Sequence, residues 1–255
     1  MKVVKKYSNI IYPVISLLIL IGIWAVFAKI VGIEIIVPSL KNTFINLGQI
    51  LSGAKFYSAA LNTLLRSIIA FALAMVSAVV LSIISAFFPI VFKLLSPLIA
   101  IMRAVPTMSI ILLTVVWMKP ETSPILIAYI IIFPLMYAGI YSAVVGVDKD
   151  LVDMSKAYKV SKKDMVKSLY LPSIAPSFFD ISKANISLTV KLIISAEIIA
   201  QTKLSLGIMM QIARSQLETA QLLAYTVLAI AMSYLLELIV GLIKRLVVRW
   251  QYAAK

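Results

Sequence analysis

Long apolar stretches separated by short polar ones constrain this chain more than any other feature. A helix needs about 20 apolar residues to cross the hydrocarbon core of a bilayer, and about six stretches approach that length. We predict spans at approximately 10–31, 60–88, 97–117, 124–146, 177–200 and 221–243. The predicted fold class is therefore all-α, a polytopic transmembrane helical bundle.

Composition supports a membrane protein. Hydrophobic residues make up 62% of the chain and charged residues 13%, and the mean hydropathy is +1.06, which is more apolar than a soluble domain of this size can bury. A net charge of +14 could indicate nucleic-acid binding, but the basic residues lie largely between and beside the apolar stretches, as in bilayer proteins. The chain has no Cys and no His, which excludes disulfides, thiolate or imidazole metal sites and catalysis by either residue.

The basic residues also predict an orientation. They gather in 1–6, in a loop around Lys93, in the loop 147–176 and in the tail from Lys244, which all fall on one side of a six-span arrangement. The positive-inside rule makes that side cytoplasmic, so both termini are predicted to be cytoplasmic. We expect a multi-pass protein of the cytoplasmic (inner) cell membrane.

Two regions are expected. Residues 1–59 hold an N-terminal span, which lacks a cleavage site and is expected to be retained, and an extracytoplasmic interfacial segment. Residues 60–255 hold the main transmembrane domain, with the cytoplasmic loop at 147–176.

That loop has the pattern of folded structure. Leu151, Met154 and Tyr158 recur at i, i+3 and i+7, which places them on one face of a short helix. Ser161 and Asp164 have the S-x-x-D spacing of a helix start. We therefore predict two short amphipathic helices.

Two interpretations of the loop compete. A positively charged linker that only fixes topology requires basic residues and nothing more. The apolar stripes, the start signal and Pro172, which is expected to stop the second helix, favour a docking surface for a cytoplasmic partner.

The run "VDKDLVDMSKAYKVSKKDMVKSLYLPSIAPS" resembles the EAA loop of binding-protein-dependent ABC importer permeases, whose pattern is roughly E-x-A-x-x-x-G-x-S followed by L-P. The residues at the motif positions are, in order, Asp153, Ser155, Lys159, Ser161, Leu171 and Pro172. The sequence departs from the pattern twice, because Asp replaces Glu and Lys replaces Gly.

Other stretches resemble the same family in the same order. They are "NTLLRSIIAFALA" at 62–74, "LIAIMRAVPTMSIILLTVVW" at 98–117, with a helix kink expected at Pro106, and "SAEIIAQTKLSLG" at 195–207. The "LKNT" at 40–43 and the "VRW" at 248–250 are most similar to the nitrate, sulfonate, taurine and thiamine-precursor branch. The resemblance implies a permease like those of type I ABC importers.

The resemblance implies the membrane subunit of an ATP-driven uptake system for a small polar or anionic organic solute. The resemblance also implies that the chain itself is not an enzyme and binds no cofactor. It has no G-x-x-x-x-G-K-[ST] phosphate loop, so ATP and Mg²⁺ would bind a separate ATPase. The expected partners are cytoplasmic ATPases, an extracytoplasmic solute-binding protein and a second permease copy, most simply in a homodimer, but no nucleic acid. The residues expected to couple to the ATPase are Leu151, Asp153, Met154, Ser155, Ala157, Tyr158, Lys159, Ser161, Asp164, Leu171 and Pro172.

Charged residues interrupt the predicted fifth span. A charge in hydrocarbon costs roughly 2.5 kcal/mol or more, so such groups usually face a bundle interior or a water-filled path. One hypothesis is a translocation path that includes Ser187, Lys191 and Glu197, with Lys191 favouring an anionic or polar solute. The alternative is structural: Lys191 pairs with Glu197 or Glu237, and Lys183 extends to the headgroups.

Other transporter classes share this hydropathy. A secondary transporter would more often show paired repeats or discontinuous spans rich in Gly and Pro. The membrane component of a vitamin-type (energy-coupling factor) importer would carry a short Ala-Arg-Gly signature, which is absent here. An intramembrane enzyme would need a nucleophile, base or metal cluster. The sequence does not identify the solute.

Overall fold

The computed structural model describes the backbone of residues 2–249 and the side chains of residues 11–249, and all regular structure in this part is helical. The elements are α1 (Lys2–Val31), α2 (Leu40–Ser52), α3 (Ala54–Phe87), α4 (Pro89–Ala104), α5 (Thr107–Trp117), α6 (Ser123–Val145), α7 (Lys149–Ala157), α8 (Lys162–Met165), the π-helical segment η1 (Val166–Tyr170), α9 (Leu171–Ala200), α10 (Leu206–Ser215) and α11 (Thr219–Val247). Two predicted features, the "MKVVKK" side chains and the end of the C-terminal tail, lie outside the described residues.

The chain divides into two compact units. One contains Met1–Tyr57 and Met209–Leu228, and the other contains Ser58–Ile208 and Ala229–Lys255. In the first unit, two hydrogen bonds fix the connection that follows α1. The Trp24 indole N–H donates to the Pro38 carbonyl at 3.0 Å, and the Thr219 hydroxyl donates to the Glu34 backbone carbonyl at 2.7 Å. The Ser39 hydroxyl caps α2, which is the helix expected at the membrane interface.

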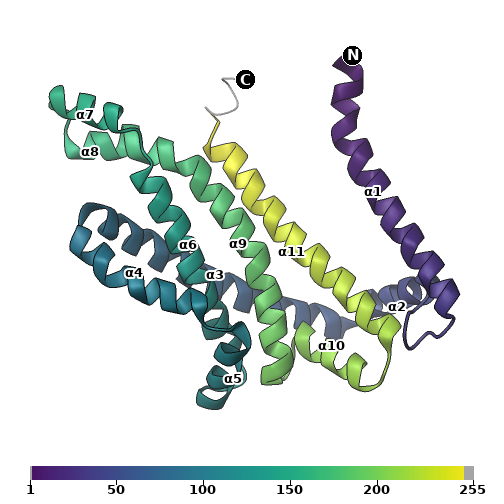
Figure 1. Cartoon of the computed structure of the whole chain (residues 1–255). Helices are drawn as coiled ribbons and strands as arrows, with labels where there is room; N and C mark the ends of the chain where they lie inside the picture. The colour runs from purple at the N-terminus through teal and green to yellow at the C-terminus, as the bar shows by residue number, and fades with distance from the viewer. Residues whose placement is uncertain (1, 250–255) are drawn as a thin grey trace. The chain divides into compact units, whose positions relative to one another are not determined.

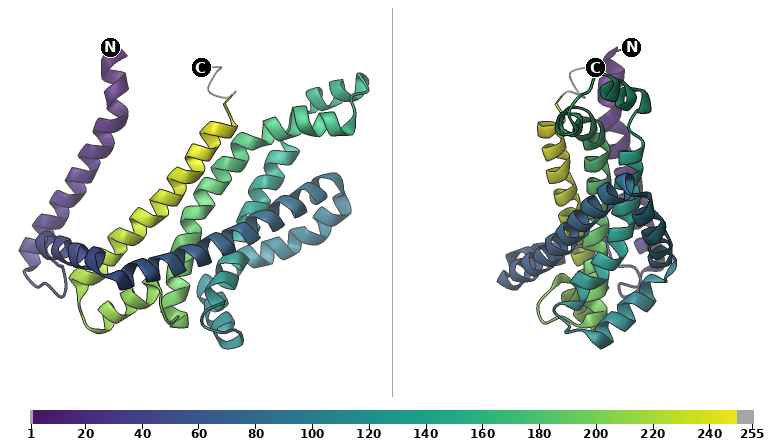
Figure 2. Two further views of the ribbon diagram at one scale, coloured as in Figure 1. Left: turned by 180° about the vertical axis from the view of Figure 1, so that it is seen from behind. Right: turned by 90° about the vertical axis from the view of Figure 1, so that its left-hand side faces the viewer.

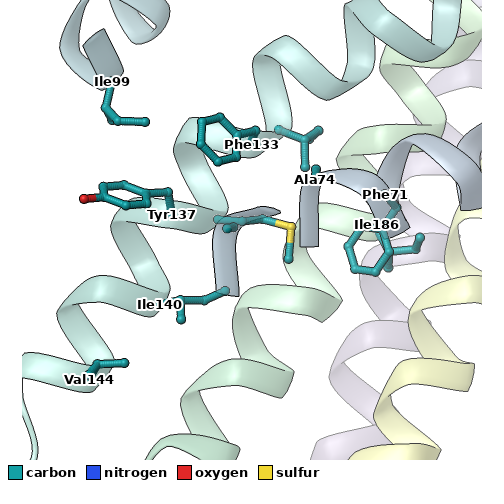
Figure 3. Close-up of a cluster of buried hydrophobic side chains, with 11 residues drawn as sticks. Phe71, Ala74, Ile99, Phe133, Tyr137, Ile140, Val144 and Ile186 are labelled. Carbon is teal, nitrogen blue, oxygen red and sulfur yellow. The ribbon is translucent and has the colours of Figure 1, made fainter. Parts of the chain in front are cut away.

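The second unit is built around α6 and α9, which lie side by side (Figure 1). Because α6 is apolar on nearly all sides, other helices can cover it from several directions. Figure 3 shows the resulting core, with Phe71 and Ala74 from α3, Ile99 from α4, Phe133, Tyr137, Ile140 and Val144 from α6, and Ile186 from α9. The long helix α3 therefore belongs to the same core as α6 and α9.

A row of aromatic side chains joins α6 to its neighbours. Tyr129, Phe133, Tyr137 and Tyr141 recur every four residues, and neighbouring rings in the row have centroids about 6 Å apart. The Tyr137 hydroxyl donates to Ser85 Oγ on α3 at 2.8 Å. The hydroxyl of Ser82, also on α3, donates to the Tyr137 carbonyl at 3.0 Å. These polar contacts satisfy buried groups and fix the register of α3 against α6.

Four of the predicted spans coincide with helices that are long and apolar enough to cross a membrane: Ile11–Val31, Ala54–Phe87, Ser123–Val145 and Thr219–Val247. The pair α4 and α5 would add a fifth if the two helices are counted together. The helix at the predicted fifth span, α9, has thirty residues, but its charges keep it out of this apolar group.

The predicted third span, 97–117, contains the break expected at Pro106, which divides it between α4 and α5. The chain bends by 95° between α4 and α5. Val105 is extended because a residue before proline avoids the helical region, and Pro106 then begins a new helix. Lys93, expected in a loop, lies inside α4.

Pro172 does not stop the second helix of the loop 147–176, so that prediction is wrong. The helix passes from α8 through η1 into α9, and Pro172 occupies the first turn of α9. The Leu171 N–H donates to the Val166 carbonyl, five residues earlier, so the wider turn precedes the proline. Inside a continuous helix, a proline donates no N–H and its ring crowds the carbonyl four residues earlier. The π-helical turn η1, which includes that residue, accommodates Pro172 without ending the helix.

Candidate functional site

A buried carboxylate anchors the end of α9. Glu197 has no exposed surface, and its Oε1 accepts from Arg66 Nη1 on α3 at 2.9 Å. Its Oε2 lies 2.9 Å from the Thr63 hydroxyl and accepts from the Gly207 N–H at 3.2 Å. The Thr63 oxygen in turn accepts the Leu206 N–H at 3.0 Å. The carboxylate is thus satisfied by one cation and several donors, as burial of a charge requires.

Arg66 also reaches a second carboxylate. Its Nη2 forms an ion pair with Glu121, and its Nε donates to the Glu121 carbonyl at 3.2 Å. The other carboxylate oxygen of Glu121 accepts from the Lys203 N–H at 2.9 Å. The Arg66 side chain, 11% exposed, therefore joins α3 to the turn before α6 and to the end of α9 with its following turn. We call Thr63, Arg66, Glu121 and Glu197 the Arg66 cluster.

Gly207 makes the Arg66 cluster sterically possible. A Cβ at this position would lie 2.5 Å from the Glu197 Cβ, 2.7 Å from the Ile194 carbonyl oxygen and 2.9 Å from the Ile198 nitrogen. Two of these atoms belong to the backbone of α9, which cannot move aside easily. The Glu and Gly of the "SAEIIAQTKLSLG" stretch therefore belong to one contact.

The ion pairs differ from those considered from sequence. Glu197 pairs with Arg66 and not with Lys191, whereas Glu237 pairs with Lys183 at 3.3 Å. Because Glu197 is enclosed, the proposed path does not include it. Arg66 was not among the partners predicted for Glu197, although a lone Arg within the apolar run 60–88 indicates that a charged partner exists.

The exposed face of α9 is polar, which is unusual for a membrane helix. Leu171, the first residue of α9, is the one large apolar residue among the exposed positions of this helix. The others are Ser173, Ser177, Asp180, Ala184, Lys191 and Ser195. By contrast, α3 exposes Leu65, Ile68, Leu73 and Val76. Lipid suits the α3 surface, whereas the α9 surface requires water or another protein chain.

Two of the predicted path residues lie on or beside this face. Lys191 is exposed, and within residues 11–249 no carboxylate pairs with it. Ser187 is half-buried one turn earlier. The Asp180 carboxylate, in contrast, accepts from Lys244 of α11 at 2.6 Å. Lys191 is therefore the uncompensated positive charge of the α9 face among the described residues.

The loop 147–176 has the helix α7 and the helix start at Ser161 that the sequence predicts. Asp148 caps α7, and Ser161 caps α8, where its hydroxyl accepts from the Asp164 N–H at 3.2 Å and donates to the Asp164 carboxylate. The apolar side chains Leu151, Met154 and Tyr158 are exposed, the last by 79%. Most of the other predicted coupling residues are exposed, namely Asp153, Ala157, Lys159, Asp164 and Leu171. Ser155 and Pro172 are half-buried.

Lys159, at the family's Gly position, has a left-handed backbone with φ +53°. Its N–H donates to the Lys156 carbonyl at 2.9 Å, and the Val160 N–H donates to the Ser155 carbonyl at 3.0 Å. These two bonds form a Schellman motif, in which glycine is favoured because a side chain is strained at positive φ. The loop thus has, at Lys159, the left-handed turn that a glycine would adopt without strain.

One salt bridge lies on the surface of α7. Lys156 Nζ is 2.8 Å from the Asp153 carboxylate, whose hydrogen bond and charge raise the pKa of Lys156 above its ordinary value. Both groups are solvent-exposed, so the pair contributes little to stability.

Comparison with known proteins agrees with these features. The profile of the family described as binding-protein-dependent transport system inner membrane component matches residues 78–251. The chain belongs to this family. Members are membrane subunits of ABC transporters, in which a separate chain hydrolyses ATP.

One relative of known description is the riboflavin transport system permease protein RibX of Chloroflexus aurantiacus (strain ATCC 29366 / DSM 635 / J-10-fl). It is 23% identical over 158 residues, which cover 62% of this chain and 59% of the relative. The match thus spans about three-fifths of the relative's length.

Among solved structures, the inward-facing MetNI methionine ABC transporter has a similar fold, with a TM-score of 0.62 and 15% identity over 74% of this chain and 94% of that one. This agrees with the predicted all-α type I permease fold.

Substitution Gly207→Ala tests the contact with Glu197. The added methyl group meets backbone atoms of α9, so we expect a loss of roughly 1–3 kcal/mol of stability, seen as a lower midpoint in thermal unfolding of the detergent-purified protein. Gly241→Ala on α11, where a Cβ meets nothing within 4 Å, is the control and should not lower the midpoint. Equal midpoints for the two variants would contradict the tight contact.

Substitution Arg66→Met leaves Glu197 buried without its cation. We expect a loss of about 3–5 kcal/mol, and a partial recovery in the double variant Arg66→Met/Glu197→Gln, measured by the same unfolding assay. Lys183→Met removes the partner of Glu237 in a pair whose side chains are 43% and 31% exposed, and should cost at most about 1 kcal/mol. A double variant no more stable than Arg66→Met would argue against coupling of the two side chains.

Substitution Lys159→Gly tests the left-handed turn. Glycine relieves a penalty of roughly 1 kcal/mol, so the amides of 158–160 should exchange more slowly with deuterium. The control Lys163→Gly lies in α8 with no positive φ and should speed exchange there, because glycine weakens a helix. Faster exchange in Lys159→Gly would show that the turn is not strained.

Proposed function

We propose that this chain is the membrane-spanning subunit of an ATP-driven ABC importer, and that it forms the path through which a small polar or anionic organic solute enters the cell. Its partners would be cytoplasmic ATPases, an extracytoplasmic solute-binding protein and a second copy of the permease. Family membership supports this role, and the polar exposed face of α9 is the observation that carries it.

The loop 147–176 is the proposed contact with the ATPase. It presents Leu151, Met154 and Tyr158 to solvent from a capped, folded helix. An apolar face on such a helix favours docking in a groove of a partner. A loop that served topology alone would need only its lysines.

Movement of this contact could reach the span directly. Because α8 and η1 continue into α9, a force on the loop acts on the helix that carries Lys191. ATP-driven closure of the ATPases would thus move α9 as a lever between inward-open and outward-open states.

The solute class follows from the charge on α9. Ser187 and Lys191 line the proposed path, and the ammonium group of Lys191 has no counterion among the described side chains. In a low-dielectric path, such a cation favours an anion over a neutral solute. Sulfonates, nitrate, taurine and thiamine precursors are the anionic or polar solutes suggested by the resemblance.

A flavin is a second candidate solute. The similarity to a riboflavin transport permease favours it, and the serines of the α9 face could bond its polar groups. The two candidates differ in their need for Lys191.

The coupling contact can be tested by crosslinking, because the chain has no cysteine of its own. We expect Tyr158→Cys to react through a thiol–amine crosslinker with the co-purified ATPase, and ATP to change the yield. Ser168→Cys, exposed on η1, is the control and should crosslink less. If no cysteine between 151 and 165 gives a nucleotide-sensitive product, the coupling assignment fails.

The path assignment can be tested by uptake into proteoliposomes that contain the whole transporter. Lys191→Met should reduce uptake of an anionic solute by about tenfold, equivalent to about 1.4 kcal/mol of binding free energy, whereas Lys183→Met should change it little. Unchanged uptake of every anion tested would remove Lys191 from the path. Undiminished riboflavin uptake by Lys191→Met would favour the flavin alternative.

A further inference from the structure

A cavity of about 750 Å³ lies between the end of α3, α7 and η1, away from the α9 face. Figure 2 shows these elements at one end of the second unit. In its left view, the green helices α7 and α8 lie above the blue turn between α3 and α4. The volume falls in the range of sites for small molecules. Apolar side chains form most of its lining, among them Phe87, Val152, Val160 and Val166.

The cavity leaves these apolar groups uncovered within the chain. Phe87 is 54% exposed and Val166 44%. The lining residues of α7 are Val152 and Lys156, which are distinct from the residues predicted to dock on the ATPase, Leu151, Met154 and Tyr158. The two sides of α7 therefore present two different surfaces.

The charge around the cavity is positive. Lys156 and Lys162 line it, and Lys149 lines an adjoining cavity of about 300 Å³ together with Asp153. Asp153 offsets Lys156 through their salt bridge, whereas no carboxylate among the described residues pairs with Lys162. The charged groups thus leave an excess of positive charge beside an apolar floor.

The position of the cavity indicates which ligand combines these two properties. Phe87 ends the long apolar helix α3, and the lysines belong to the loop assigned to the cytoplasmic side. Lipid headgroups of the inner leaflet lie at this boundary, and basic pockets there attract anionic lipids. A free phosphate would use the lysines but not the apolar floor.

We propose that this cavity binds an anionic phospholipid, with its acyl chains on Phe87 and Val166 and its phosphate on Lys156 and Lys162. The site would connect the lipid of the inner leaflet to the loop that is proposed to couple to the ATPase. It does not depend on the identity of the transported solute.

Native mass spectrometry of the detergent-purified full chain tests the site. With phosphatidylglycerol added, we expect the double variant Lys156→Gln/Lys162→Gln to retain at least about fivefold less bound lipid than the unmodified chain. The matched control Lys163→Gln/Lys167→Gln removes the same charge from exposed positions outside the cavity and should retain it. Phosphatidylcholine should bind more weakly than phosphatidylglycerol to the unmodified chain.

A second variant distinguishes lipid binding in the cavity from lipid attraction by surface charge. Val152→Trp fills the space without changing any charge and should also lose phosphatidylglycerol, while it elutes as the unmodified chain does in size exclusion. Equal losses in the two lysine variants, or full retention in Val152→Trp, would overturn the proposal. Displacement by inorganic phosphate would show that the site holds the headgroup alone, and displacement by the added ATPase would assign the cavity to that interface; either result overturns it.

Discussion

The ion pair between Arg66 and Glu197 is the interaction on which the second unit most depends. A single buried charge is unstable among the apolar helices, because neither lipid nor hydrophobic side chains can solvate it. Pairing the two groups, and adding donors from Thr63 and the backbone of Gly207, removes this cost. The arrangement fixes the end of α9 to α3 and determines where the turn after α9 must lie.

With its end fixed, α9 has two sides in different environments. One side packs on α6, where Ile186 and Ile193 share buried clusters with residues of that helix. The other side carries Lys191 and the serines. This division explains why hydropathy separates α9 from the uniformly apolar spans: a helix in the centre of a transport unit needs a polar face and an apolar one, not uniform hydrophobicity.

The loop 147–176 differs from α9, because interactions between residues close in the chain build it. The caps at Asp148 and Ser161 and the left-handed turn at Lys159 depend on residues within a few positions of each other. Such a unit keeps its shape while its apolar side chains remain exposed. It is continuous with α9 through η1, so the proposed movement of the loop would act directly on α9.

The sequence by itself determined the helical class, the positions of most long helices, the cap at Ser161 and the family resemblance, because each depends on periodicity or on residues close in the chain. Only the tertiary structure decided the partner of Glu197, which is 131 residues away in the chain, the 95° bend at Pro106 and the passage of the helix through Pro172. A proline pattern marks where a helix can change direction, but neighbouring helices determine the angle. Likewise, an intramembrane charge predicts that a partner exists, and only packing selects which one.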